Sequence, residues 1–277
     1  MSIQTINLSH QSAAQQLVQS LHDSGFAIID EVPFNLNLIQ SCYQSWAKFF
    51  ENPDEQYIYQ QSTGAGWVKR EHSEKAKDAK VKDIKEFYHF YLGEQCPNQL
   101  LKMTESIYHQ SYDLAVKLLS WIQDASPSTI TQHFSRPLHE MVCQKNTLLR
   151  IIHYPALGDY FIPDAVRAAP HEDINLLTVL PSGTADGLEV LLPDGTWWPV
   201  KLKPHQCVIN IGDMLQECSQ GYYCSTKHRV VNPDEKDVAR YSMPLFLHAK
   251  DDVVLSERYN AKSYLTERLR EIGLIKD

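Results

Sequence analysis

The sequence lacks an excess of positive charge and lacks any long apolar run. Its 26 Lys and Arg residues are outnumbered by 34 Asp and Glu residues, so the formal net charge is −8. An acidic chain is not attracted in general to phosphate backbones or anionic lipids, so we expect neither nucleic acid nor a membrane as a partner. No apolar run approaches the roughly 18 residues that cross a bilayer. Residues 1–16 lack the basic flank and apolar centre of a secretion signal, which predicts a cytoplasmic protein.

Closely spaced cysteines are also absent. The chain has six cysteines, which are scattered and form no CxxC pair. Disulfide frameworks of small secreted domains and zinc sites built from thiolates both need such spacing. We therefore expect free and mostly buried thiols at Cys42, Cys96, Cys143, Cys207, Cys218 and Cys224.

What the chain does have is enough apolar content for one large core. It has 277 residues, of which 43% are hydrophobic, and we predict a single domain over residues 1–277. This domain would combine a helix-rich region at 1–135, a β-rich core at 146–250 and a C-terminal helix within 251–277. Apolar residues at helical spacing predict helices at 10–24, 36–50, 97–123 and 256–272. The charged, glycine-interrupted stretch 64–90 predicts a long surface loop that ends in an aromatic strand.

After about residue 145, short runs of β-branched, aliphatic and aromatic residues alternate with turn residues. These runs predict strands at 147–154, 174–180, 188–192, 197–202, 206–211, 228–231 and 240–249. Residues 26–30 predict a further short strand near the N-terminus. Seven or more short strands at this spacing favour a sandwich or barrel over β–α–β units. The expected fold class is therefore mainly β with flanking helices.

A candidate metal site begins at His171 and Asp173, which stand two residues apart directly before the apolar run 174–180. Residues i and i+2 of a strand point to one face, so the imidazole and the carboxylate could meet at one point. His228 opens another predicted strand and is the candidate third ligand. Two histidines and one carboxylate form the facial triad of non-haem Fe(II) oxygenases, which leaves three coordination positions open.

A candidate carboxylate site lies twelve residues after His228. Arg240 and Ser242 share one face of the last predicted strand, and a guanidinium with a hydroxyl suits a carboxylate. Arg240 could instead pair with a nearby surface acid. Tyr154 ends the strand predicted at 147–154, and it is either part of this carboxylate site or a core aromatic residue with its hydroxyl at the rim.

In this order, the HxD pair, the later histidine and the RxS pair resemble the isopenicillin N synthase-like branch of the iron(II)/2-oxoglutarate-dependent dioxygenases, the iron/ascorbate oxidoreductase family. The resemblance extends over most of the chain and is carried by the stretches 25–33, 83–90, 148–155, 171–180, 187–200, 208–233 and 240–248. It implies a double-stranded β-helix, a distorted jelly roll. Many members read Asn-Tyr-Tyr-Pro where this chain has Ile152-His153-Tyr154-Pro155.

The resemblance also implies a ligand set and an activity. Fe(II) would be held by His171, Asp173 and His228, and the 5-carboxylate of 2-oxoglutarate by Tyr154, Arg240 and Ser242. The implied enzyme is an oxidoreductase that uses O2 and 2-oxoglutarate to hydroxylate a small organic substrate, with ascorbate as a candidate reductant. Two alternatives stay open: a 2-oxoglutarate-independent oxidase of the isopenicillin N synthase type, and a non-catalytic jelly-roll protein that binds a small ligand. The sequence predicts neither the substrate nor the oligomeric state.

Overall fold

The computed structural model describes residues 3–73, 82–158, 165–232 and 238–271. Within these residues the strands form two sheets. The larger sheet has nine strands in the order β1-β2-β10-β7-β13-β5-β4-β3, with β12 paired to β5, and the smaller sheet has the order β6-β11-β8-β9. The strands of the larger sheet are β1 (Thr5–Asn7), β2 (Phe26–Asp30), β3 (Gly66–Val68), β4 (Glu86–Phe90), β5 (Leu148–Tyr154), β7 (Leu177–Pro181), β10 (Cys207–Ile211), β12 (Arg240–Ser242) and β13 (Leu245–Leu247). Those of the smaller sheet are β6 (Ala168–His171), β8 (Leu188–Leu191), β9 (Trp197–Pro199) and β11 (His228–Val230).

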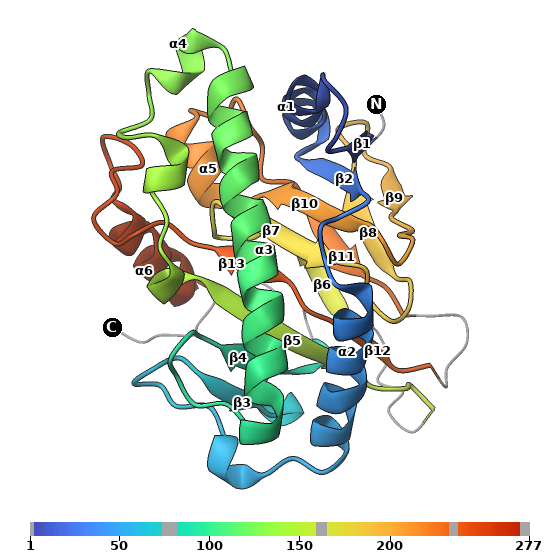
Figure 1. Ribbon diagram of the computed structural model, residues 1–277. Coiled ribbons are helices and arrows are strands. Elements are labelled where there is room, and N and C mark those ends of the chain that lie inside the picture. Colours follow the sequence, from blue (N-terminus) through green and yellow to red (C-terminus); the bar gives the residue numbers. More distant parts are fainter. Residues whose placement is uncertain (1–2, 74–81, 159–164, 233–237, 272–277) are drawn as a thin grey trace.

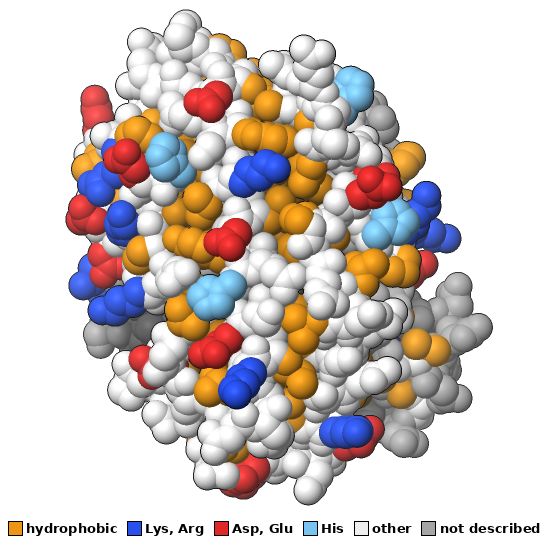
Figure 2. Space-filling view, viewed as in Figure 1, with side chains coloured by type: hydrophobic (Ala, Val, Ile, Leu, Met, Phe, Trp, Pro, Cys, Tyr) orange, Lys and Arg blue, Asp and Glu red, His pale blue; other side chains and the backbone are white. Residues whose placement is uncertain are grey.

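Helices cover one face of the larger sheet (Figure 1). The long helix α3 packs on β7 and β13, and it also contacts α1 and α2. The helices are α1 (Ala13–Ser24), α2 (Leu36–Glu51), α3 (Asn98–Ala125), α4 (Ser128–Thr131), α5 (Asp213–Cys218) and α6 (Ala261–Glu271). Short 3-10 turns lie at Glu55–Tyr57, Arg70–His72, Leu138–Glu140 and Gln144–Asn146. On the face formed by the first three helices, acidic and basic side chains are interspersed (Figure 2). No helix in the described part of the chain is long and apolar enough to cross a membrane.

Alternation along β5 separates two cores. Leu149 and Ile151 point toward the helices and belong to the main hydrophobic cluster. Ile152 and Tyr154 pack in a separate cluster with Ala168 of β6 and Val230 of β11, between the two sheets. Successive side chains of a strand point to opposite faces, so one strand serves both cores. The space between the sheets is therefore distinct from the helix-covered core.

Gly25 ends α1 in a conformation that the close packing of the chain requires. Its φ is +71°, and its N–H donates to the carbonyl oxygen of Leu21. A Cβ at this position would lie 2.5 Å from the carbonyl oxygen of Cys224 and 2.3 Å from Oγ1 of Thr226. Only glycine tolerates both the positive φ and this close approach. The end of α1 therefore abuts the segment that leads into β11.

Most predicted elements are present, within a few residues at their ends. The four predicted helices correspond to α1, α2, α3 and α6, and the strand at 26–30 is β2. All six cysteines are free, and Cys42, Cys96, Cys207 and Cys218 are buried. The predictions of free thiols and of the main helices are thus confirmed.

Three sequence predictions were wrong in detail. Residues 64–90 end in the predicted aromatic strand, which is β4, but the stretch before it is not all loop, because β3 lies there and pairs with β4 in the larger sheet. The strand predicted at 240–249 is divided into β12 and β13, since Pro244 between them has no N–H to donate to a ladder. The strand predicted at 174–180 begins only at Leu177. β1, β6, α4 and α5 were not predicted.

Candidate active site

The three predicted metal ligands meet between the two sheets. His171 is the last residue of β6 and His228 the first of β11, and the two are cross-strand partners. Asp173 lies two residues beyond β6, in the segment that leads to β7. One ligand atom from each residue lies within 4.8 Å of the others. The predicted cluster is confirmed, although β6 ends at His171, so that Asp173 lies just beyond the strand rather than in it.

Each histidine is oriented by a hydrogen bond to a backbone carbonyl two residues before it. Nδ1 of His171 lies 2.8 Å from the carbonyl oxygen of Ala169, and Nδ1 of His228 lies 3.1 Å from that of Thr226. A carbonyl can only accept, so Nδ1 carries the proton and Nε2 keeps its lone pair. The two rings are close neighbours, with their centroids 4.4 Å apart. Both imidazoles are thus held in the tautomer that ligates a metal through Nε2.

Asp173 is held on one side by two polar side chains from the larger sheet. Its Oδ2 accepts hydrogen bonds from Thr178 Oγ1 at 2.6 Å and from Asn210 Nδ2 at 2.8 Å. Asn175 donates to the Thr178 hydroxyl at 2.9 Å and so directs its proton toward Asp173. The other oxygen, Oδ1, lies 3.7 Å from Nε2 of His228 and faces the histidines. One carboxylate oxygen therefore remains available as a ligand.

Sequence analysis did not identify Thr178 and Asn210. Both are almost fully buried, with 2% and 3% of their surface exposed. Each is a polar residue in an otherwise apolar strand, and buried polar side chains are found where they have a hydrogen-bond partner. That contrast within "LLTVL" and "VINI" is the signal that could have identified them.

Burial and neighbouring charges set the protonation of the ligands. Burial, and then the neighbouring His228, lower the pKa of His171 to about 4. For Asp173, burial by itself would raise the pKa, but the two histidines and the hydrogen bonds from Thr178 and Asn210 outweigh burial and hold the pKa below its usual value. His171 is therefore neutral and Asp173 ionised at neutral pH, which are the forms that bind a metal.

The predicted carboxylate-binding residues line the same cavity as the triad. Tyr154, Arg240 and Ser242 all border it, together with His171, Asp173 and His228. Arg240 is the cross-strand partner of Tyr154, and its guanidinium carbon lies 5.1 Å from the centre of that ring. Arg240 is only 4% exposed; its Nε donates to the carbonyl oxygen of Ala185 at 3.0 Å, and its Nη1 has no partner. A buried N–H without an acceptor beside a cavity is suited to an anionic ligand.

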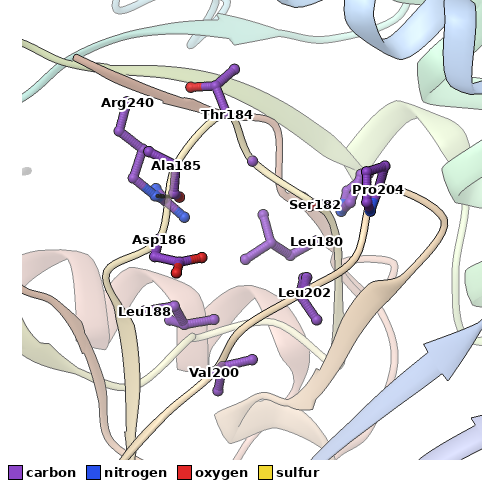
Figure 3. Close-up of a pocket in the computed structure, with 12 residues that line it drawn as sticks. Leu180, Ser182, Thr184, Ala185, Asp186, Leu188, Val200, Leu202, Pro204 and Arg240 are labelled. Atoms are coloured by element: carbon purple, nitrogen blue, oxygen red, sulfur yellow. Dashed lines mark hydrogen bonds between the residues drawn. The ribbon is translucent and has the colours of Figure 1, made fainter. Parts of the chain in front are cut away.

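Arg240 also borders a second hollow, on the side of the loop before β8 (Figure 3). Figure 3 shows its guanidinium beside Ala185 and Asp186, while Leu180, Val200 and Leu202 form an apolar wall. Leu180 and Leu188 border both hollows as well. Arg240 therefore lies in the partition between the metal-side cavity and this second hollow.

Ile152 and His153, which replace the Asn-Tyr of many family members, lie on opposite faces of β5. Ile152 lines the cavity, so an apolar side chain takes the place of an amide there. His153 points away from it, donating from Nδ1 to Glu86 at 2.9 Å and stacking on Tyr241. Lys85, which directly precedes Glu86 in the chain, does line the cavity and is paired with Asp83 at 2.9 Å.

Comparison with known protein families gives two matches along the chain. Residues 145–249 match the 2OG-Fe(II) oxygenase superfamily, and residues 3–108 match the N-terminal region of the non-haem dioxygenases in morphine synthesis. The first match contains the triad and the residues Tyr154, Arg240 and Ser242. The second contains α1 and α2 and the strands β1 to β4.

Three solved structures are similar over nearly the whole chain. A protein from Shewanella oneidensis, described as a candidate oxygenase, is 42% identical with a TM-score of 0.89, over 99% of this chain and 100% of that chain. A 2OG-Fe(II) oxygenase family protein from Caulobacter crescentus is 30% identical with a TM-score of 0.78, over 98% and 99% of the two chains. A Neurospora crassa protein solved in complex with alpha-KG shares the fold at 22% identity, with a TM-score of 0.77 over 96% and 95% of the chains.

Curated relatives match over shorter segments. A 2-oxoglutarate-dependent dioxygenase of Didymella fabae is 37% identical over 120 residues, which is 42% of this chain and 35% of that protein. Gibberellin 2-beta-dioxygenase 8 of Arabidopsis thaliana is 36% identical over 132 residues, which is 47% and 37% of the two chains. The matched segments thus span little more than a third of either relative.

Proposed function

The chain belongs to the 2OG-Fe(II) oxygenase superfamily, and on this premise we propose that it is an Fe(II)- and 2-oxoglutarate-dependent dioxygenase that hydroxylates a small organic substrate. The observation that carries this proposal is the shared cavity. The His171, Asp173 and His228 triad and the buried guanidinium of Arg240 border one space. A metal-chelating keto acid with a distal carboxylate is the cosubstrate that such a pair of sites suits.

The donor set fits iron. Two imidazoles and one carboxylate, fixed from behind by hydrogen bonds, form the facial arrangement that non-haem Fe(II) sites use. His171, Asp173 and His228 would hold the ion, which when bound supplies the O2-activating redox chemistry. The role of the chain is to hold these three ligands rigidly and to keep His171 neutral.

The distal carboxylate of 2-oxoglutarate would be bound by Arg240, Ser242 and Tyr154. Nη1 of Arg240 lacks a partner, and the fork of a guanidinium binds both oxygens of a carboxylate. Ser242 is 2% exposed and Tyr154 is 3% exposed, so the carboxylate would be desolvated when bound. Desolvation strengthens the charge-assisted hydrogen bonds, and the apolar lining from Phe26, Leu180 and Phe246 helps to exclude water.

In the overall reaction, both oxygen atoms of O2 are accounted for by 2-oxoglutarate and the substrate. O2 delivers one oxygen atom to 2-oxoglutarate, which loses CO2 and becomes succinate, and the other oxygen atom to a C–H bond of the substrate, which becomes C–OH. The primary substrate would enter the part of the cavity beside the metal, where Arg150 and Phe246 also line the wall. O2, 2-oxoglutarate and a small organic molecule are therefore the proposed partners.

The test is an anaerobic titration of the Fe(II)-loaded protein with 2-oxoglutarate. Binding of the keto acid to the metal should produce a weak charge-transfer band in the visible spectrum, and the Asp173→Ala variant should show none. On admission of O2, slow formation of succinate should follow. If neither band nor succinate is observed while iron-dependent O2 uptake persists, the protein is instead an oxidase in which Arg240 holds a substrate carboxylate. Loss of O2 uptake as well would favour a non-catalytic binding protein.

A further inference from the structure

Arg167, just before β6, is a buried cation to which the proposed function assigns no role. It is 0% exposed. Nη2 donates to the carbonyl oxygens of Val238 and, at 3.4 Å, of Pro155, while Nε and Nη1 are buried without a partner. Neutral carbonyls satisfy only part of a guanidinium with five N–H groups. A buried charge left in this state is costly unless an anion approaches it.

The two carbonyls place Arg167 behind the proposed carboxylate site. Pro155 directly follows Tyr154, and Val238 precedes Arg240 by two residues. Arg167 thus holds the ends of the two segments that carry the carboxylate-binding side chains. Its charge also acts at this site, because burial and then the charge of Arg240 lower the pKa of Arg167 to about 10. At that value the group is still a cation at neutral pH.

Arg167 and Arg240 are two cations that interact electrostatically in this region. Both are almost completely buried, and each has at least one N–H nitrogen without a partner. Two like charges in a region of low dielectric repel each other, and an anion placed beside one of them relieves the repulsion. Arg240 lines the cavity and Arg167 does not, so the anion would contact Arg240 and be attracted by both.

We propose that Arg167 is a positioning residue and second cation of the site for the distal carboxylate of 2-oxoglutarate. It holds the segments that carry Tyr154 and Arg240, and its charge strengthens the binding of a carboxylate that it does not touch. The proposal rests on the proposed function, because the anion is the cosubstrate. Its consequence is selection for a dianionic keto acid over one that lacks the distal carboxylate.

This selectivity distinguishes an electrostatic role of Arg167 from a purely structural one. 2-Oxopentanoate has the same five-carbon chain and keto acid group as 2-oxoglutarate, but a methyl group in place of the distal carboxylate. A loss of positive charge at Arg167 weakens only the ligand that carries the second carboxylate. A distortion of the cavity weakens both ligands.

The experiment measures both dissociation constants by calorimetry, with Mn(II) in place of Fe(II) so that O2 does not react. Arg167→Met should weaken 2-oxoglutarate about tenfold or more, as expected for loss of a cation near a desolvated carboxylate, and change 2-oxopentanoate less than about threefold. Arg167→Lys, which keeps the charge, should retain most of the preference for 2-oxoglutarate. Arg136→Met is the matched control, since it removes a surface cation paired with Asp252 at 3.0 Å. It should change neither constant.

Several outcomes would overturn the inference. Equal weakening of both ligands in Arg167→Met would make the residue a structural support only. Unchanged affinity for 2-oxoglutarate would show that its charge does not matter. If Arg167→Met does not fold, Arg167→Gln provides the same comparison, and failure of both neutral variants with a folded Arg167→Lys would again assign a structural role. Wild-type protein that binds neither keto acid would instead contradict the proposed function itself.

Discussion

Thr178 of β7 and Asn210 of β10 are direct cross-strand partners, and both donate a hydrogen bond to the same carboxylate oxygen of Asp173. The register of two strands in the larger sheet thereby orients a ligand that lies outside that sheet. Outer hydrogen bonds of this kind fix a ligand's geometry and tune its charge.

Removing one of these donors should weaken metal binding without removing a ligand. Thr178→Val keeps the shape of the side chain but leaves Oδ2 of Asp173 with one donor fewer. We expect the affinity for Fe(II) or Mn(II) to fall by about 10- to 100-fold, the usual cost of losing such a partner. The measurement is a metal titration followed by calorimetry.

Thr104→Val is the matched control for this experiment. Thr104 is equally buried, and its hydroxyl accepts from Trp46 Nε1 at 3.0 Å, in the helix-covered core. This variant should lose stability but keep its metal affinity. Equal metal affinity in both variants would show that the Thr178 hydroxyl does not support the site.

Each of the three ligands should be needed to retain iron. His171→Ala, Asp173→Ala and His228→Ala each leave two protein ligands, too few to hold a labile divalent ion. We expect stoichiometric iron in the wild type and only trace iron in each variant, measured by elemental analysis after desalting. His139→Ala, at an exposed position, should keep full iron content. Full iron content in all three ligand variants would disprove the assignment.

The fold should tolerate loss of a ligand better than loss of a core residue. His171 is only partly buried at the end of a strand, whereas Leu177 is 0% exposed in the main core. Leu177→Ala should lower the free energy of unfolding by about 2–5 kcal/mol. Metal-free His171→Ala should lose clearly less in urea unfolding. An insoluble His171→Ala would mark the residue as structural.

Arg240 should control the affinity for 2-oxoglutarate. Arg240→Ala removes the cation that faces the distal carboxylate, and loss of one partner of a desolvated charge pair commonly costs about 2–5 kcal/mol, or at least tenfold in affinity. Arg240→Lys should recover only part of this, because an ammonium cannot form the two-pronged contact. The readout is the 2-oxoglutarate concentration that half-saturates the charge-transfer band. If Arg240→Ala has the same half-saturating concentration of 2-oxoglutarate as the wild type, Arg240 does not bind the cosubstrate.

Stability of the metal-free protein should depend on pH through two partly buried histidines. Burial lowers the pKa of His171 and of His248 from 6.5 to about 4. Between these values the unfolded chain binds more protons than the folded one, so the free energy of unfolding should fall as the pH falls from about 6.5 toward 4. Above pH 7 both histidines are neutral in the folded and in the unfolded protein, so they no longer change the free energy of unfolding.

His248→Phe isolates this effect, because it removes one of the two groups at a similar size. Urea unfolding between pH 7.5 and 5 should show a shallower pH dependence in His248→Phe than in the wild type. His139→Phe, at an exposed histidine, should leave the slope unchanged. The same slope in all three proteins would mean that His248 takes up its proton in the folded state.

The sequence by itself determined the residues of the candidate site and the main helices. His171, Asp173, His228, Tyr154, Arg240 and Ser242 all border one cavity, as their order in the chain predicted. The helices were predictable because apolar residues at a period of 3.6 depend only on neighbours in the chain. Free cysteines likewise followed from spacing alone.

Only the tertiary structure decided how these residues are held. The pairing of Thr178 with Asn210, the hydrogen bond from Asn210 to Asp173, and the hydrogen bonds from Arg167 to Pro155 and Val238 depend on contacts between distant segments. Strand register and the burial of single polar groups arise from such long-range contacts, which leave no periodic pattern in the chain. The sequence therefore specified which groups meet at the candidate site, and the packing of the two sheets specified their orientation and support.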